Sequence, residues 1–460
     1  MKAVKGVKQD FTEGKVLKKL IFFALPMALA TLMQMLFNSA DVAIVGRFAG
    51  SNSQAAVGAT SSTVHLIVNL FVGLSVGANV VMANAYGAKD EARQQRVVHT
   101  AFAMALISGF VVLGIGLFLS RYILQWINTP QNVLEKATVY MQIYFIGAPA
   151  LMVYNFCASI MRAVGETKKP LLYLLVAGVL NVVINVVTVV FFKWHVIGVA
   201  LGTAVSQYVS AIWITFDLTR AKDSSRLCLR KVRLHSKEFR KILHIGLPMG
   251  LNSCCFSLAN LFVQSSINAF GEYAIAGNTI SNNVDTICDS FTSAVMNAVV
   301  TITGQNMGAR KPERIKRIIG AGSLVCCICH SVYILIMVFF GKYVFSIYSA
   351  DAVVIEWAIK RMKVVTFSQL FMFPMQSFGG ALRGMGYSVF PMFINLCCTC
   401  VFRIVYMLAV YPFLPVQTIF AVYVLYPITW FLSSLLQTVF CIVCLKKELI
   451  KKSAETPNVE

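Results

Sequence analysis

Long apolar segments recur along the whole chain, and they restrict its fold more than any other feature. A helix needs about 20 mostly apolar residues to span a bilayer, and the sequence supplies twelve such stretches. Because 58% of the 460 residues are hydrophobic and only 13% are charged, a water-soluble core could not bury them. We therefore expect an all-α integral membrane protein with twelve transmembrane helices. The expected spans are residues 20–40, 56–85, 97–119, 137–158, 171–192, 196–219, 242–267, 274–305, 315–340, 353–377, 389–411 and 416–445.

The positive charge is distributed as expected for a membrane protein and does not indicate nucleic-acid binding. The formal net charge is +21, and most Lys and Arg residues lie in short segments between the apolar stretches. Alternate segments hold 31 and 8 of them, and Arg403 lies inside a span. Since positive residues concentrate on the cytoplasmic side, we expect both termini to be cytoplasmic. The first apolar stretch lacks the cleavage pattern of a signal peptide, so it is predicted to be a retained span.

The two halves of the sequence repeat each other. Pro26 corresponds to Pro248 at a separation of 222 residues, while Gly165 corresponds to Gly386 at 221. Six spans in each half make the repeats parallel. This predicts two six-helix lobes around a central cleft, with an N-terminal lobe at 1–219, a basic cytoplasmic linker at 220–241 and a C-terminal lobe at 242–460.

Neither the cysteines nor the histidines form a pattern typical of metal binding or catalysis. Most of the 13 cysteines lie inside apolar stretches, where they pack as small polarizable side chains. Zinc sites usually combine paired clusters on polar loops, so we expect no zinc site and no disulfides. The six histidines are scattered and the loops are short. These features argue against an enzyme.

Several motifs together resemble one transporter family. They are NSADVAIVGRFAG (38–50), AAVGATSS (55–62), ANAYGAKDEAR (83–93) with its repeat TGQNMGARKPER (303–314), MRAVGETKKP (161–170) and GVLNVVINVV (178–187). The chain resembles the multidrug and toxic compound extrusion (MATE) family, in its bacterial NorM-type branch, over nearly its whole length. The resemblance implies alternating access between two lobes and export driven by Na⁺ or H⁺ entry.

The resemblance assigns an ion site in the N-terminal lobe to Asp41, Asn181, Asn185 and Thr203. Asn185 departs from the family pattern, because many members carry a carboxylate there. A carboxylate deep in an apolar span is expected to be functional. With amide and hydroxyl oxygens nearby it could bind a proton or Na⁺, and the loss of the second carboxylate favours the proton. In the alternative interpretation Asp41 only pairs with Arg47.

A second set of polar residues is expected in the C-terminal lobe. Asp285 and Arg403 match acidic and basic positions of bacterial family members, and Asp289 lies four residues after Asp285 on the same helix face. We expect an acidic, proton-linked site that attracts cationic substrates. In the alternative interpretation one of the two carboxylates neutralises Arg403 as a buried pair. Pro26 is expected to kink the first span, and bending of this span is tied to transport in the family.

The leading hypothesis is a secondary active antiporter that exports cationic or amphipathic drugs or metabolites. The alternative is a lipid-linked sugar flippase of the same superfamily, which would require an Arg-rich cleft. We expect no cofactor except H⁺ or Na⁺ as the coupling ion, no metal other than Na⁺ at Asp41, and no nucleic-acid partner. The protein is expected to be a monomer that contacts membrane lipid and organic cations in the cell (inner) membrane.

Overall fold

The computed structural model describes residues 9–49, 51–127 and 129–455, and within these ranges it contains helices and no strands. Contact clustering divides the chain into two compact units. The basic residues 2–8, which the charge comparison places on the cytoplasmic side, lie outside the described residues.

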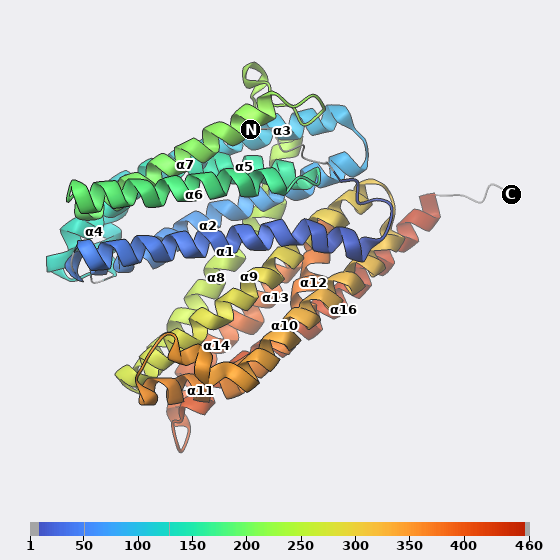
Figure 1. The fold of residues 1–460 in the computed structure, drawn as a ribbon. Helices are drawn as coiled ribbons and strands as arrows, with labels where there is room; N and C mark the ends of the chain where they lie inside the picture. The colour runs from blue at the N-terminus through green and yellow to red at the C-terminus, as the bar shows by residue number, and fades with distance from the viewer. Residues whose placement is uncertain (1–8, 50, 128, 456–460) are drawn as a thin grey trace. The chain divides into compact units, whose positions relative to one another are not determined.

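The first unit contains the described residues of Leu29–Gly250, together with Gln9 and Asp10. Its core is formed by α5, which packs on α2, α3 and α7, while α6 packs along α7 (Figure 1). Its helices are the second part of α1 (Val16–Phe48), α2 (Ser51–Gly87), α3 (Glu91–Trp126), α4 (Gln131–Ile146), α5 (Ala148–Ala163), α6 (Lys168–Val186), the π-helical η1 (Val187–Phe191), α7 (His195–Thr219), the short η2 (Leu229–Lys231) and the first part of α8 (Ser236–Asn268).

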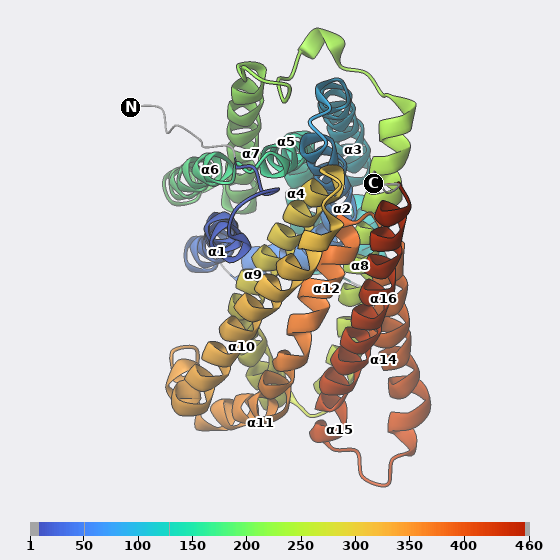
Figure 2. The same cartoon turned by 90° about the vertical axis from the view of Figure 1, so that its right-hand side faces the viewer.

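The second unit contains Phe11–Ala28 and the described residues from Leu251 onward. In it α9 packs on α10, α11 and α12, and α12 packs on α16 (Figure 2). Besides parts of α1 and α8, its helices are α9 (Glu272–Gly308), η3 (Pro312–Arg314), α10 (Ile315–Ser346), α11 (Ala352–Ser368), η4 (Gln369–Phe371), α12 (Met372–Gly384), α13 (Val389–Asn395), η5 (Leu396–Val401), α14 (Phe402–Val405), η6 (Tyr406–Val410), η7 (Tyr411–Phe413), α15 (Ile419–Tyr423) and α16 (Leu425–Glu455).

The twelve expected spans all coincide with helices. Among the described residues nine helices are long and apolar enough to cross a membrane, and the pair α4 and α5, bent by 44°, makes a tenth. The remaining two spans are α9, whose hydropathy is lowered by Asp285 and Asp289, and the broken helix from α11 to α12. The fold is therefore an all-α membrane fold with six spans in each half of the chain.

Two helices are shared between the units. The first part of α1 belongs to the second unit, where Phe23 is buried in a core with residues of α9, α10, α12 and α16. The first part of α8 belongs to the first unit, where it packs closely against α2. A glycine of α2 makes this close packing possible, because a Cβ at Gly77 would lie 2.5 Å from the Ile242 carbonyl oxygen of α8. Small residues allow such contact between membrane helices. The units thus differ from the expected lobes in these two half-helices.

The backbone repeats as the sequence does. Lys89 and Arg310, 221 residues apart, both have positive φ, at 56° and 55°. Gly165 and Gly386, at the same separation, have φ values of 86° and 95°. Left-handed conformations are uncommon for residues with a Cβ, so their recurrence at equivalent turns shows that the two halves share a backbone plan.

Candidate ion-binding site

A cavity of about 300 Å³ lies inside the first unit. It is lined by side chains of α1, α2, α4, α5, α6 and α7, and Asp41 is the only carboxylate among the described residues that line it. Asp41 is 8% exposed. A single buried carboxylate in a polar cavity can bind one monovalent cation or a proton.

The structure brings Asp41 together with the three residues expected beside it. Asn185 Nδ2 donates to Asp41 Oδ1 at 2.5 Å, and with its amide oriented toward Asp41 the Asn181 nitrogen donates to the same oxygen at 2.8 Å. The Asn181 oxygen then accepts from the Thr203 backbone N–H at 3.1 Å, and the Thr203 hydroxyl also interacts with Asp41. Asn181 and Asn185 are one helical turn apart, so one face of α6 presents both amides.

The local sequence fixes the position of Asn185. It is fully buried, and a Cβ at Gly202 of α7 would lie only 2.0 Å from Asn185 Oδ1, so only glycine lets the two helices approach this closely. The π-helix η1 begins two residues after Asn185, and such segments are frequent at functional sites. Asn185 Oδ1 has no hydrogen-bond partner. This free oxygen could complete a set of ligands with Asp41 and Thr203.

Asp41 does not pair with Arg47. Its hydrogen-bond partners come from α6 and α7, and no ion pair joins it to Arg47 in the part of the chain that the structure describes. The alternative interpretation of Asp41 as a partner of Arg47 is therefore not supported by the geometry.

In the second unit Asp285 is neutralised by Arg361, a residue that the sequence comparison did not select. Arg361 of α11 donates to Asp285 Oδ2 and, at 2.8 Å, to the Ser281 hydroxyl, while the Tyr333 hydroxyl donates to Asp285 Oδ1 at 2.5 Å. The Arg361 side chain is 3% exposed. Arg361 is one of the 8 Lys and Arg residues that the charge count above assigns to the outer segments. This assignment is wrong, because Arg361 lies inside α11 and in a buried ion pair. Its position within the expected span 353–377 was the signal that could have identified it.

Arg403 has neutral partners instead of a carboxylate. Its guanidinium donates to the Thr429 hydroxyl at 3.0 Å and to Asn260 Oδ1 at 3.1 Å. It also lies 4.4 Å from the centre of the Tyr426 ring, and Arg361 lies 5.7 Å from the same ring. No ion pair joins Arg403 to Asp285 or Asp289 among the described residues, so the geometry does not support the alternative in which one of these carboxylates neutralises Arg403. Asp285 is paired with Arg361 instead, and Arg403 is stabilised by hydrogen bonds and the aromatic face.

Asp289 is the less constrained carboxylate of the second unit. It lies one turn after Asp285 on α9, and its buried Oδ1 has no hydrogen-bond partner. Asp285 has two strong donors and a balancing charge, whereas Asp289 keeps an oxygen available. The two expected carboxylates thus lie in different environments.

Pro26 lies inside α1, two residues before the point at which α1 passes from the second unit to the first. Proline removes one backbone hydrogen bond from a helix and favours a bend. A bending role for Pro26 in this helix stays a prediction.

Comparison with known proteins identifies the family. The MatE family model matches residues 26–187 and again 248–408. The "Probable multidrug resistance protein YpnP" of Bacillus subtilis (strain 168) is 27% identical over 395 residues, which cover 86% of this chain and 88% of that protein. The "Probable multidrug resistance protein NorM" of Thermotoga maritima is 23% identical and covers 83% of this chain and 82% of its own length.

A solved structure shares the fold. A structure described as "Outward-facing conformation of a multidrug resistance MATE family transporter of the MOP superfamily" matches with a TM-score of 0.88 at 20% identity. The match covers 97% of this chain and 99% of that one. The described helices define a polytopic membrane fold. The chain belongs to the MATE family, since the family model covers most of its length in both halves.

Proposed function

We propose that the protein is a secondary active antiporter that exports cationic or amphipathic compounds in exchange for H⁺ or Na⁺. The observation that carries this proposal is the polar cavity of the first unit with its single carboxylate, Asp41. A site with one negative charge can balance one positive charge at a time. A bound ion and a cationic substrate that compete for it would be exchanged in alternating states.

The ligand chemistry supports either coupling ion. Protonation of Asp41 would remove a buried charge without moving its neighbours, because the amides of Asn181 and Asn185 can remain in place. For Na⁺, oxygen ligands are required, and Asp41, the free Asn185 Oδ1 and the Thr203 hydroxyl supply three candidates. The single formal charge of the site favours the proton.

The second unit contributes to substrate binding in this proposal. Asp289, with its free oxygen, attracts the cationic group of the substrate, while the pair of Asp285 and Arg361 holds α9 against α11. The flippase alternative is weaker, because one of the two buried arginines described above is already neutralised by Asp285.

We place the protein in the cell (inner) membrane as a monomer with both termini cytoplasmic. The asymmetry of Lys and Arg between alternate segments supports this orientation, and the named multidrug resistance proteins among its relatives support a role in export.

The test is transport in vesicles with the two gradients imposed separately. Purified protein is reconstituted, and movement of ethidium is followed by fluorescence with a pH gradient alone, a Na⁺ gradient alone, or neither. We expect transport against the dye gradient with one of them and none in protein-free vesicles. If neither gradient drives ethidium or any other organic cation tested, the antiport proposal is wrong.

A further inference from the structure

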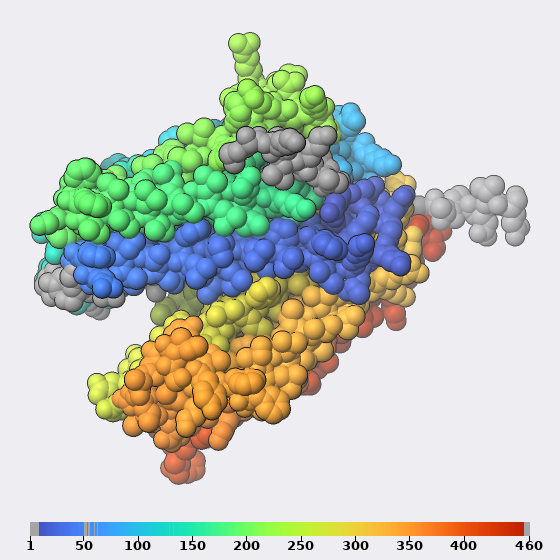
Figure 3. Space-filling model, viewed as in Figure 1, coloured from blue at the N-terminus to red at the C-terminus, as the bar shows by residue number. Residues whose placement is uncertain are grey.

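A basic cavity lies on the first unit, at the polar end of α3, apart from the ion site. It has a volume of about 630 Å³ and is lined by part of α3 and part of the linker before α8. Four cationic side chains and no carboxylate line it: Arg96, Arg230, Lys231 and Arg233. The linker that carries three of them stands out from the helices of this unit in the space-filling view (Figure 3).

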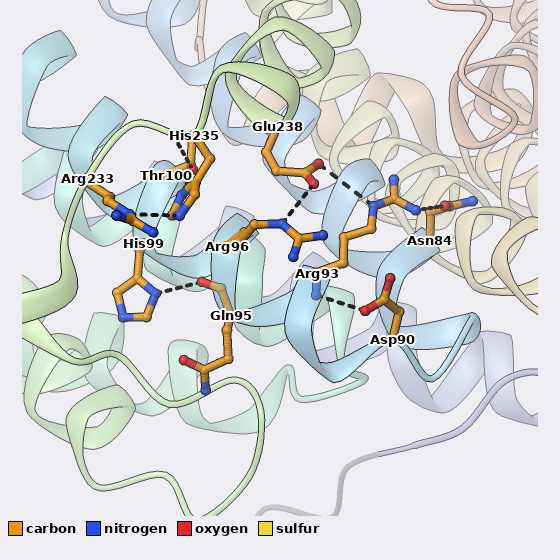
Figure 4. Close-up of polar contacts among 10 residues, drawn as sticks. All are labelled: Asn84, Asp90, Arg93, Gln95, Arg96, His99, Thr100, Arg233, His235 and Glu238. Atoms are coloured by element: carbon orange, nitrogen blue, oxygen red, sulfur yellow. Dashed lines mark hydrogen bonds and ion pairs between the residues drawn. The ribbon is translucent and has the colours of Figure 1, made fainter.

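Hydrogen bonds hold the linker in place and so give the cavity a defined shape. The Cys228 N–H donates to His99 Nε2 at 3.1 Å, and the His235 N–H donates to the Thr100 hydroxyl at 3.2 Å. Arg233 Nε donates to His235 Nε2 at 3.1 Å (Figure 4), and both residues line the cavity. Both ends of the basic segment are therefore fixed to α3, unlike a solvated run of charges.

The cations outnumber the anions that could neutralise them. Glu238 is buried and is shared by Arg93 and Arg96, at 3.7 and 3.6 Å (Figure 4). Arg230, Lys231 and Arg233 have no ion pair with any described carboxylate, and Arg233 donates to the uncharged Nε2 of His235. A concave surface with this excess of positive charge focuses the field that attracts anions.

The repeat relates one cation of this cavity to an apolar residue of the other half. With the separation of 222 residues that relates Pro26 to Pro248, Arg233 takes the place of Phe11. In the second unit Phe11 is 1% exposed and packs in the core, and its N–H donates to the Gln305 side chain at 3.0 Å. At equivalent positions of the repeat, the buried Phe11 packs in the second unit, whereas the exposed Arg233 lies on the first unit.

We propose that this cavity binds a phosphate group, supplied by the headgroup of an anionic membrane lipid. Basic pockets beside the polar ends of transmembrane helices are suited to such headgroups, and Arg96 directly precedes the expected span 97–119. Two apolar side chains of the same linker, Leu229 and Leu234, are 57% and 43% exposed. They can contact acyl chains, which a soluble phosphate compound lacks. The bound lipid anchors the linker between the two halves.

The cations of the cavity also affect the pKa of His235. Burial lowers the pKa of His235, and the neighbouring Arg233, Arg96 and His99 lower it further, while Glu238 acts in the opposite direction. Thr100, to which the His235 N–H donates, is uncharged. A bound phosphate group would offset the cations, so lipid binding should raise the pKa of His235.

The test measures lipid binding to the full-length protein in detergent. Phosphatidylglycerol bound per protein is counted by native mass spectrometry, with phosphatidylcholine as the uncharged comparison. The cavity variant replaces three linker cations by glutamine, Arg230→Gln, Lys231→Gln and Arg233→Gln. The control removes the same charge at the start of α8, outside the cavity, with Lys237→Gln, Arg240→Gln and Lys241→Gln. Monodispersity and the melting temperature confirm that each variant is folded.

We expect phosphatidylglycerol to bind the cavity variant about one hundredfold more weakly, from about fivefold for each basic side chain, and the control to retain binding. Equal losses in the two variants would mean general charge attraction and would overturn the proposal. Displacement of the lipid by inorganic phosphate at equal concentration would confirm the phosphate site and make soluble phosphate its source, overturning the lipid assignment. His235, followed by NMR, should shift its pKa upward with phosphatidylglycerol in the wild-type protein. The measurement uses no gradient, so it is independent of the antiport proposal.

Discussion

The buried pair of Arg361 and Asp285 gives the sharpest prediction of stability. In Arg361→Met the carboxylate of Asp285 loses its balancing charge while it stays buried at 5% side-chain exposure. Removing one partner of a buried pair costs about 3–5 kcal/mol. For a unit of this size that corresponds to a decrease in Tm on the order of 10 °C, measured as thermal unfolding of the purified protein in detergent by tryptophan fluorescence.

The neighbouring Lys360 provides the control. Lys360→Met breaks a pair with Glu356 in which the side chains are 35% and 65% exposed, so it should cost less than about 1 kcal/mol. The double variant Arg361→Met/Asp285→Asn leaves no unpaired charge and should recover most of the lost stability. If Arg361→Met unfolds at the same temperature as Lys360→Met, the assignment of this pair as a buried, charge-neutralising contact is refuted.

Three further predictions concern other parts of the chain. Gly202→Ala places a methyl group 2.0 Å from Asn185 Oδ1 and should therefore displace Asn185. We expect a loss of about 1–3 kcal/mol of stability, measured by thermal unfolding, and a lower rate of efflux. Unchanged efflux would contradict the role of Asn185. Arg233→Gln removes a cation that lowers the pKa of His235, so an NMR titration should give a higher pKa, and a lower one would contradict the electrostatic argument. Phe11→Ala opens a cavity at a side chain that is 1% exposed and should cost about 3–5 kcal/mol, whereas an unchanged Tm would show that this segment is not part of the core.

Much of the fold could be predicted from the sequence because spans and repeats are properties of continuous segments. The twelve expected spans follow from the apolar stretches of the sequence, and all of them coincide with helices. The sequence repeat is matched by equivalent backbone turns at Lys89 and Arg310. The proximity of Asp41 and Asn185 was expected from the family pattern, and the structure brings them into contact. Their function stays a prediction.

What the sequence missed depends on contacts between distant segments. A count of Lys and Arg in alternate segments assigns Arg361 to a loop. Its partner Asp285 is 76 residues away in the sequence, so the count does not reveal the ion pair. The division of α1 between the units depends on the core that Phe23 enters, and that of α8 depends on its close packing against Gly77 of α2. Hydropathy describes how apolar a segment is, but it does not identify the helix against which each part of that segment packs.

The carboxylate of Asp41 can be tested directly by comparing two variants in the same vesicles. Asp41→Asn removes the charge that lines the cavity, whereas Asp217→Asn removes a partly exposed carboxylate of the same unit that pairs with Lys169 at 2.8 Å. Gradient-driven ethidium transport is measured for both and for the wild-type protein. We expect Asp41→Asn to abolish the coupling of transport to the ion gradient and Asp217→Asn to keep it. Coupled transport that continues at the wild-type rate in Asp41→Asn would contradict the assignment of Asp41 as the ion site.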